Sequence, residues 1–117
     1  MFRLYAKEIL LYTMPMDMRR GIDGLWMVVS AQFQGAAQQE NMYLFLNRRQ
    51  DKIKILYWDR NGFCLWHKRL EKGVFKVAFD KKAGICCLTS AQLHWLLDGL
   101  DYTKIHGHKS LDYQTFF

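Results

Sequence analysis

Cations and aromatic rings are concentrated in residues 53–70, whose sequence is IKILYWDRNGFCLWHKRL. Within this stretch Asn61-Gly62 separates two runs rich in β-branched and aromatic residues, and this dipeptide favours the two-residue type I′ turn of a β-hairpin. The stretch therefore predicts a hairpin with Asn61-Gly62 as its loop. The cross-strand pairs that follow from this loop are Arg60 with Phe63, Trp58 with Leu65, Leu56 with His67, and Lys54 with Arg69.

One face of this hairpin mixes positive charge with flat rings, and it carries Lys54, Trp58, Arg60, Phe63, His67 and Arg69 beside Leu56 and Leu65. Basic groups neutralise phosphates and rings stack on bases, so the face is a candidate nucleic-acid-binding surface. The opposite face is more apolar and is assigned to the core; its members are Ile53, Ile55, Tyr57, Asp59, Cys64, Trp66, Lys68 and Leu70.

Two other interpretations of the basic face stay open. Its apolar members could lie beneath a helix while the cations reach the rim. Its rings and arginines could instead anchor a protein partner, because interfaces are enriched in aromatic residues and Arg. If the helices cover Trp58, Leu65 and Leu56, the functional face becomes the one around Tyr57, Trp66 and Lys68.

Further basic residues lie close to predicted elements. Arg19 and Arg20 fall in the first turn of a predicted helix, where the helix dipole disfavours cations. Arg48 and Arg49 belong to a basic turn, residues 47–52, directly before the hairpin. They are candidates for clamping phosphates at the edge of the same sheet, although solvated side chains explain both pairs as well.

The sequence offers no arrangement suited to catalysis. A phosphodiesterase needs clustered carboxylates to hold metal ions, whereas the acids here sit at turns, caps and helix ends: Asp17, Asp23, Asp59, Asp98 and Asp101. Cys86-Cys87 are too close for a C-x-x-C half-site, and His106-x-His108 has no second pair. Cys64 and His67 point to opposite hairpin faces. We therefore expect no enzyme activity, no metal, no cofactor and no small-molecule substrate.

Bulk properties set the class of protein. The chain has 117 residues, a formal net charge of +6 and a pI near 9.3, which predict one domain over residues 1–117 and favour a polyanionic partner such as DNA. The three cysteines, the absence of a secretory signal and the lack of an apolar run of roughly 20 residues predict a cytoplasmic protein without membrane contact.

The predicted elements form an α+β domain. Strands are expected within residues 4–13, at 42–46, in the hairpin and at 74–79, the last four forming a meander. A first helix is expected from Asp17 as N-cap to about Gly35, and a second from a Thr89-x-x-Gln92 capping box. The expected fold is an antiparallel sheet of about four or five strands built around the central hairpin, with two helices packed on it. The tail, residues 102–117, has no clear pattern.

Several motifs together resemble one known family. They are DMRRGIDGL from Asp17, NRR from Asn47, IKILYWDRNGFCLW from Ile53, KRLEKG from Lys68, and LT, QL and LDGLD between Leu88 and Asp101. In this order and spacing they look like the accessory protein called TnpB, or Orf2, of bacterial insertion sequences of the sixty-six type. The motifs cover most of the chain, and the hairpin motif is the most specific.

The resemblance implies a small protein encoded beside a separate DDE-type transposase and a further small accessory protein, and needed for efficient transposition. Its partners would then be DNA at the element ends, or the transposase itself, in the bacterial cytoplasm and at the nucleoid when bound to DNA. Two departures stand out: Val77-Ala78-Phe79 replaces the expected tryptophan-proline pair, and the tail after Asp101 matches nothing in the family pattern.

Overall fold

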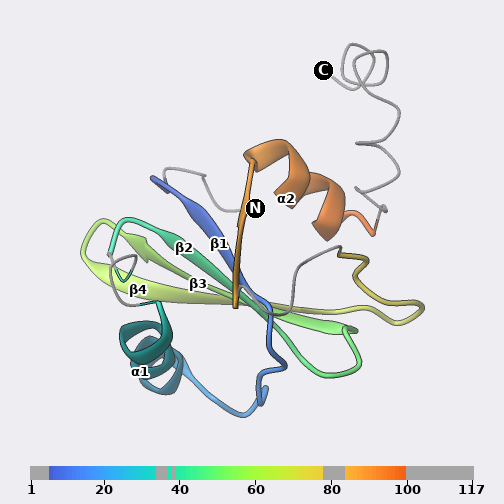
Figure 1. The fold of residues 1–117 in the computed structure, drawn as a ribbon, viewed down its shortest axis with the longest axis horizontal. Helices are drawn as coiled ribbons and strands as arrows, with labels where there is room; N and C mark the ends of the chain where they lie inside the picture. Colours follow the sequence, from blue (N-terminus) through green and yellow to red (C-terminus); the bar gives the residue numbers. More distant parts are fainter. Residues whose placement is uncertain (1–5, 34–36, 38, 78–83, 100–117) are drawn as a thin grey trace.

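A computed structural model describes residues 6–33, 37, 39–77 and 84–99. In chain order its elements are β1 (Ile9–Tyr12), α1 (Ile22–Gln32), β2 (Met42–Leu46), β3 (Lys52–Asp59), β4 (Gly62–Arg69), β5 (Ile85–Leu88) and α2 (Ser90–Leu97). The strands form one sheet in the order β4-β3-β2-β1-β5, in which β1 and β2 are parallel and the other neighbours antiparallel (Figure 1). The predicted α+β fold is confirmed.

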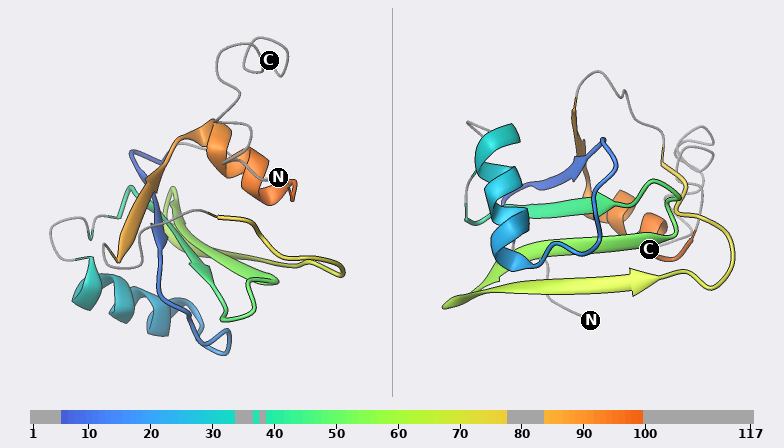
Figure 2. Two further views of the ribbon diagram at one scale, coloured as in Figure 1. Left: turned by 45° about the vertical axis from the view of Figure 1, so that its right-hand side comes forward. Right: turned by 90° about the horizontal axis from the view of Figure 1, so that it is seen from below.

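The two helices lie on opposite faces of the sheet (Figures 1 and 2). Beneath α1, the side chains of Leu25, Val29 and Phe33 pack on Leu10, Tyr43, Phe45 and Leu56. Beneath α2, those of Leu93, Leu96 and Leu97 pack on Leu11, Leu44, Ile53 and Ile55. The hairpin face assigned to the core is buried on the α2 side, and on the other face Leu56, Phe63 and Leu65 lie beneath α1, as the alternative of an apolar stripe under a helix expected.

The first helix begins later than predicted. Its N-cap is Gly21 rather than Asp17, whose carboxylate instead accepts hydrogen bonds from Arg19. Residues 17–20 form a turn that precedes α1, so Arg19 and Arg20 do not lie in the first helical turn. Leu25, Val29 and Phe33, spaced four residues apart, are all buried. The helix ends at Gln32; residues 34–36, where its end was expected, lie outside the described residues.

The hairpin forms with a different register. Its loop is Arg60-Asn61, and Gly62 is the first residue of β4, so Trp58 pairs with Phe63 and Lys54 with His67. The Trp58 and Phe63 rings meet edge to face with centroids 5.0 Å apart, and Trp58 Nε1 donates to the Arg60 carbonyl at 3.0 Å. These contacts support a turn that places Arg60 at φ 56°. Because the slip is two residues, every side chain keeps its predicted face.

The strand predicted over residues 74–79 is wrong for its described part. Residues 74–77 have no strand structure, and 78–79 lie outside the described residues. Phe75 instead fills the core on the α2 side from a loop, fixed by two hydrogen bonds to Gln50: Phe75 N to the Gln50 carbonyl at 2.7 Å and Gln50 Nε2 to the Phe75 carbonyl at 3.0 Å. The meander is therefore β2-β3-β4, and β5 pairs with β1 at the other edge.

The second helix starts as predicted. Thr89 Oγ1 accepts from the Gln92 backbone N–H at 3.1 Å, and Gln92 Oε1 accepts from the Thr89 N–H at 2.8 Å. This capping box satisfies two backbone donors that a helix start leaves open. At the other end of α2, Lys68 Nζ donates to the Leu97 carbonyl at 2.6 Å, where a cation also suits the helix dipole.

Replacing Thr89 by alanine should lower the free energy of unfolding by about 1 kcal/mol, the usual cost of losing an N-cap side chain. Thr89→Ser is the matched control, because serine keeps the hydroxyl. Urea denaturation of both variants measures the difference. Equal stability of the alanine and serine variants would contradict the capping role.

Candidate nucleic-acid interface

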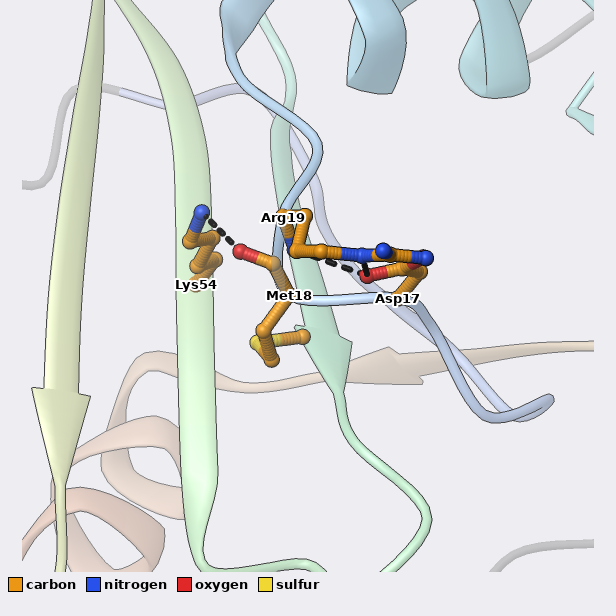
Figure 3. Close-up of polar contacts among 4 residues, drawn as sticks. All are labelled: Asp17, Met18, Arg19 and Lys54. Carbon is orange, nitrogen blue, oxygen red and sulfur yellow. Dashed lines mark hydrogen bonds and ion pairs between the residues drawn. The ribbon is translucent and has the colours of Figure 1, made fainter.

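Three segments distant in the sequence meet at one end of the sheet. Met16 N donates to the Leu46 carbonyl at 2.8 Å, which places the segment before α1 beside the end of β2. Lys54 Nζ, on β3, donates to the Met18 carbonyl at 2.6 Å (Figure 3) and to the Arg20 carbonyl at 2.9 Å. Leu70 N donates to the Asp51 carbonyl at 2.8 Å and ties the end of β4 to the β2–β3 turn. Basic residues from all three segments therefore lie close together.

The centre of this region is a group of basic residues facing one another across the hairpin. Lys52 pairs with Arg69 and Lys54 with His67, and all four side chains point to the α1 side of the sheet. We call Lys52, Lys54, His67 and Arg69 the basic quartet. Opposite positions bring Cβ atoms to within about 5 Å, where like charges destabilise a sheet. This arrangement makes the region a candidate site for an anion.

Lys54 differs from the exposed phosphate contact that the sequence predicted. Its side chain is only 8% exposed, and its ammonium is held by the two backbone carbonyls rather than by a carboxylate of the described residues. It therefore anchors the segment carrying Arg19 and Arg20 against β3. Its charge still adds to the positive potential of the basic quartet.

Lys54→Met should lower the free energy of unfolding by about 1–3 kcal/mol, because it keeps most of the side-chain volume but leaves two carbonyls without their donor. Lys52→Met, which removes a lysine from the same face and leaves these carbonyls bonded, is the control. Thermal and urea unfolding of both variants measure the effect. If Lys54→Met is as stable as the control, the anchoring role is wrong.

Arg19 and Arg20 flank this anchor. Arg19 makes a forked ion pair with Asp17, with Nη2 to Oδ2 at 2.7 Å and Nε to Oδ1 at 3.0 Å (Figure 3). The Arg19 side chain and backbone N–H hold the pKa of the Asp17 carboxyl well below its usual range, and Asp17 raises the pKa of Arg19. The Arg19 side chain is nonetheless 91% exposed. Arg20 is exposed as well and runs along Gly24 of α1.

Arg48 and Arg49 project from the β2–β3 turn and are exposed. Asn47 shapes this turn: its Oδ1 accepts from the N–H groups of Asp51 and Lys52, and its Nδ2 donates to Asp51 Oδ1 at 2.7 Å. The Asn47 amide also lowers the pKa of Asp51. Since the turn runs directly into Lys52, both arginines extend the positive surface of the basic quartet.

His67 is the titratable member of the basic quartet. Partial burial lowers its pKa from the usual 6.5, and the charges of Lys54, Lys52 and Arg69 lower it further. Arg69 pairs with Glu71, with Nε to Oε2 at 3.1 Å, so part of its charge is already compensated. His67 is therefore predominantly neutral at pH 7.

The predicted basic and aromatic face is not continuous. Trp58 and Phe63 pack with Trp26 of α1, whose ring centroid lies 5.0 Å from that of Phe63, so these rings join the helix to the hairpin. Arg60 is at the hairpin loop, about 26 Å from Lys52 at the rise of a β-strand. The candidate interface is thus the end with the basic quartet, together with Arg19, Arg20, Arg48 and Arg49, while Trp58, Arg60 and Phe63 lie away from it.

Sequence reasoning missed two residues of this arrangement. Lys52 was treated as part of a turn, and the corrected register, which pairs it with Arg69, is the signal that reveals its role. Trp26 lies four residues after Ile22, on the side of α1 that faces the sheet, and this spacing could have identified it.

Membrane-spanning helices and metal-binding clusters are both absent from the described residues. No helix in the described part of the chain is long and apolar enough to cross a membrane. Within those same residues, no three His, Cys, Asp or Glu side chains gather in a way that could hold a metal ion.

Comparisons with known proteins identify relatives along most of the chain. The family described as IS66 Orf2 like protein matches residues 7–107. The uncharacterized protein y4jC of Sinorhizobium fredii is 31% identical over 98 residues, which cover 84% of this chain and 83% of the relative. A second uncharacterized protein of that organism, y4hO, is 33% identical over 86 residues, covering 74% of each chain. No solved structure matches this chain.

Proposed function

Because this chain belongs to the IS66 Orf2-like family of insertion-sequence accessory proteins, we propose that it assists transposition by binding DNA within the transposition complex. The basic quartet and the neighbouring arginines hold the phosphate backbone, and the chemical steps of strand cleavage and joining belong to the separate transposase. The protein is a non-catalytic partner in this proposal.

The observation that carries the proposal is the opposition of like charges across β3 and β4. Lys52 faces Arg69, and this opposition of two cations costs stability in the free protein. Of the carboxylates near these residues, Asp17 pairs with Arg19, Glu71 pairs with Arg69, and Asp51 accepts a hydrogen bond from Asn47. A DNA backbone supplies closely spaced negative charges that relieve the repulsion.

Phosphate recognition of this kind fixes where the protein sits on DNA but reads no sequence by itself. We therefore expect the protein to bind unrelated duplexes and element ends with comparable affinity. Preference for the ends then comes from the transposase, which is expected to bind them at the same time.

The test is binding of labelled duplexes and single strands to the purified protein at several salt concentrations. Arg48→Gln combined with Arg49→Gln should weaken duplex binding roughly tenfold, because two phosphate contacts are lost, whereas Lys7→Gln should have little effect. Lys7 is a suitable control since it pairs with Glu40 ahead of β1, outside the three converging segments. Fluorescence anisotropy reports the affinities.

Absence of DNA binding at low salt by the folded protein would contradict the proposal. In that case the same arginines and aromatic rings would have to bind a protein. Co-purification with the transposase that persists at high salt would identify that protein contact.

A further inference from the structure

We infer that DNA phosphates bound at the basic quartet draw a proton onto His67, so that DNA binding tightens as the pH falls from 8 towards 6. The inference rests on the proposed DNA binding and deepens it, because it adds proton uptake as a regulating input to the same site. The proton comes from solvent and goes to the free ring nitrogen of the imidazole, with no other bond changed.

The position of His67 carries this inference. It lies opposite Lys54 on the neighbouring strand and two residues before Arg69 on its own strand, so all three side chains share one face. His67 is exposed, whereas Lys54 beneath the adjoining segment is buried. A phosphate that contacts Lys52 and Arg69 from solvent therefore lies next to the imidazole.

Every charged group that shifts His67 in the free protein is a cation. Lys54 and Lys52 act from β3 and Arg69 acts from β4, and together with partial burial they lower the pKa of His67 below 6.5. The neighbouring carboxylates are Asp17 on the segment before α1, Asp23 in the first turn of α1 and Glu71 after β4. None of these is a cause of the shift, so among the described residues no anion retains a proton on His67.

A bound phosphate raises the pKa of His67, whereas the surrounding cations lower it. An opposite charge within about 4–6 Å raises the pKa of a histidine by roughly 1–3 units, and here it also offsets three cations. Linkage then requires that protonation of His67 strengthen DNA binding by the same factor by which DNA strengthens protonation. Affinity should rise by up to about tenfold per pH unit between the free and the bound pKa of His67.

The stability of the free protein has the opposite pH dependence from its DNA affinity. Unfolding and binding measurements can therefore separate the two effects of His67 protonation. Because the pKa of His67 is lower in the folded than in the unfolded chain, the unfolded chain binds more protons below pH 6.5. Acid therefore reduces the stability of the free fold through His67 while it strengthens DNA binding. His67→Gln removes both dependences.

The experiment is an NMR titration of the histidine rings in the whole wild-type chain, with and without a short duplex of unrelated sequence. The His67 resonance is assigned by its loss in His67→Gln. His94, exposed on α2 with Nδ1 2.8 Å from the Ser90 carbonyl, is the internal control. We expect the pKa of His67 to rise by about one unit or more on duplex binding, and the His94 ring resonances at a fixed pH to be unchanged by the duplex.

The outcomes distinguish this inference from the proposed function. Duplex binding with an unchanged His67 pKa would overturn the inference and leave DNA binding intact. Absence of duplex binding at every pH would overturn both. Loss of the pH dependence of affinity in His67→Gln, while the wild type binds the duplex more tightly at pH 6 than at pH 8, would support both.

Discussion

Replacing Phe75 by alanine should lower the free energy of unfolding by about 3–5 kcal/mol, the usual cost of removing a buried phenyl ring. Phe75 has no accessible surface, although it belongs to a loop, and it packs on the α2 side of the sheet with Ile53 and Leu96. No strand hydrogen bonds fix its backbone. The two bonds to Gln50 hold it there, and the ring closes the core beside the start of β3.

Urea denaturation of Phe75→Ala measures this effect, and Val74→Ala is the matched control because the Val74 side chain is 42% exposed. The control should lose less than about 0.5 kcal/mol. A cost below about 1 kcal/mol for Phe75→Ala would mean that the loop does not fill the core as described.

Replacing Lys52 and Arg69 together by glutamine should change binding and stability in opposite directions. Two phosphate contacts are lost, so duplex affinity should fall by roughly 10–100-fold. One like-charge cross-strand pair is also removed, which should raise the free energy of unfolding by about 0.2–1 kcal/mol. Replacing a residue pair that only stabilised the fold would instead lower the free energy of unfolding.

Anisotropy titrations at one salt concentration measure the affinity, and urea denaturation measures the stability. Lys7→Gln again serves as the control for loss of a cation elsewhere. If the double variant binds DNA like the wild type, or if it loses stability, the basic quartet is not a site maintained for phosphate.

The parts of the fold that the sequence predicts well are those determined by local chemistry. The capping box of Thr89 and Gln92 is visible in four residues, and the buried run of β2 needs no partner to be recognised. The Asn61-Gly62 signal located the hairpin but misplaced its loop. In the observed register Trp58 packs on Phe63, and Phe63 packs on Trp26 of α1, a helix outside the hairpin.

Longer-range contacts explain the other errors. The alternation of Val74, Phe75 and Val77 suits a strand, yet the Phe75 backbone bonds to Gln50 instead of to β4, which is an edge strand of the described sheet. Asp17 has the chemistry of an N-cap, but Arg19 engages its carboxylate and the helix starts at Gly21. Local propensity gives way to tertiary contacts in both cases.

The residue types of the candidate site could be predicted from the sequence, but their arrangement in space could not. The segments that carry its basic residues are evident in the sequence as clusters of Arg and Lys beside the hairpin motif. Their convergence depends on Lys54 holding the carbonyls of Met18 and Arg20, a contact between residues more than thirty positions apart. The separation of Arg60 from the basic quartet likewise follows from the length of β3, with α1 packed between them.

The most direct test of the account is the salt dependence of duplex binding by the wild type and by the Lys52→Gln/Arg69→Gln variant. The account predicts that the logarithm of the wild-type affinity falls linearly with the logarithm of salt concentration, and that the slope of the variant is shallower by about two. Identical slopes, or wild-type affinity that does not change with salt, would contradict phosphate binding by the basic quartet.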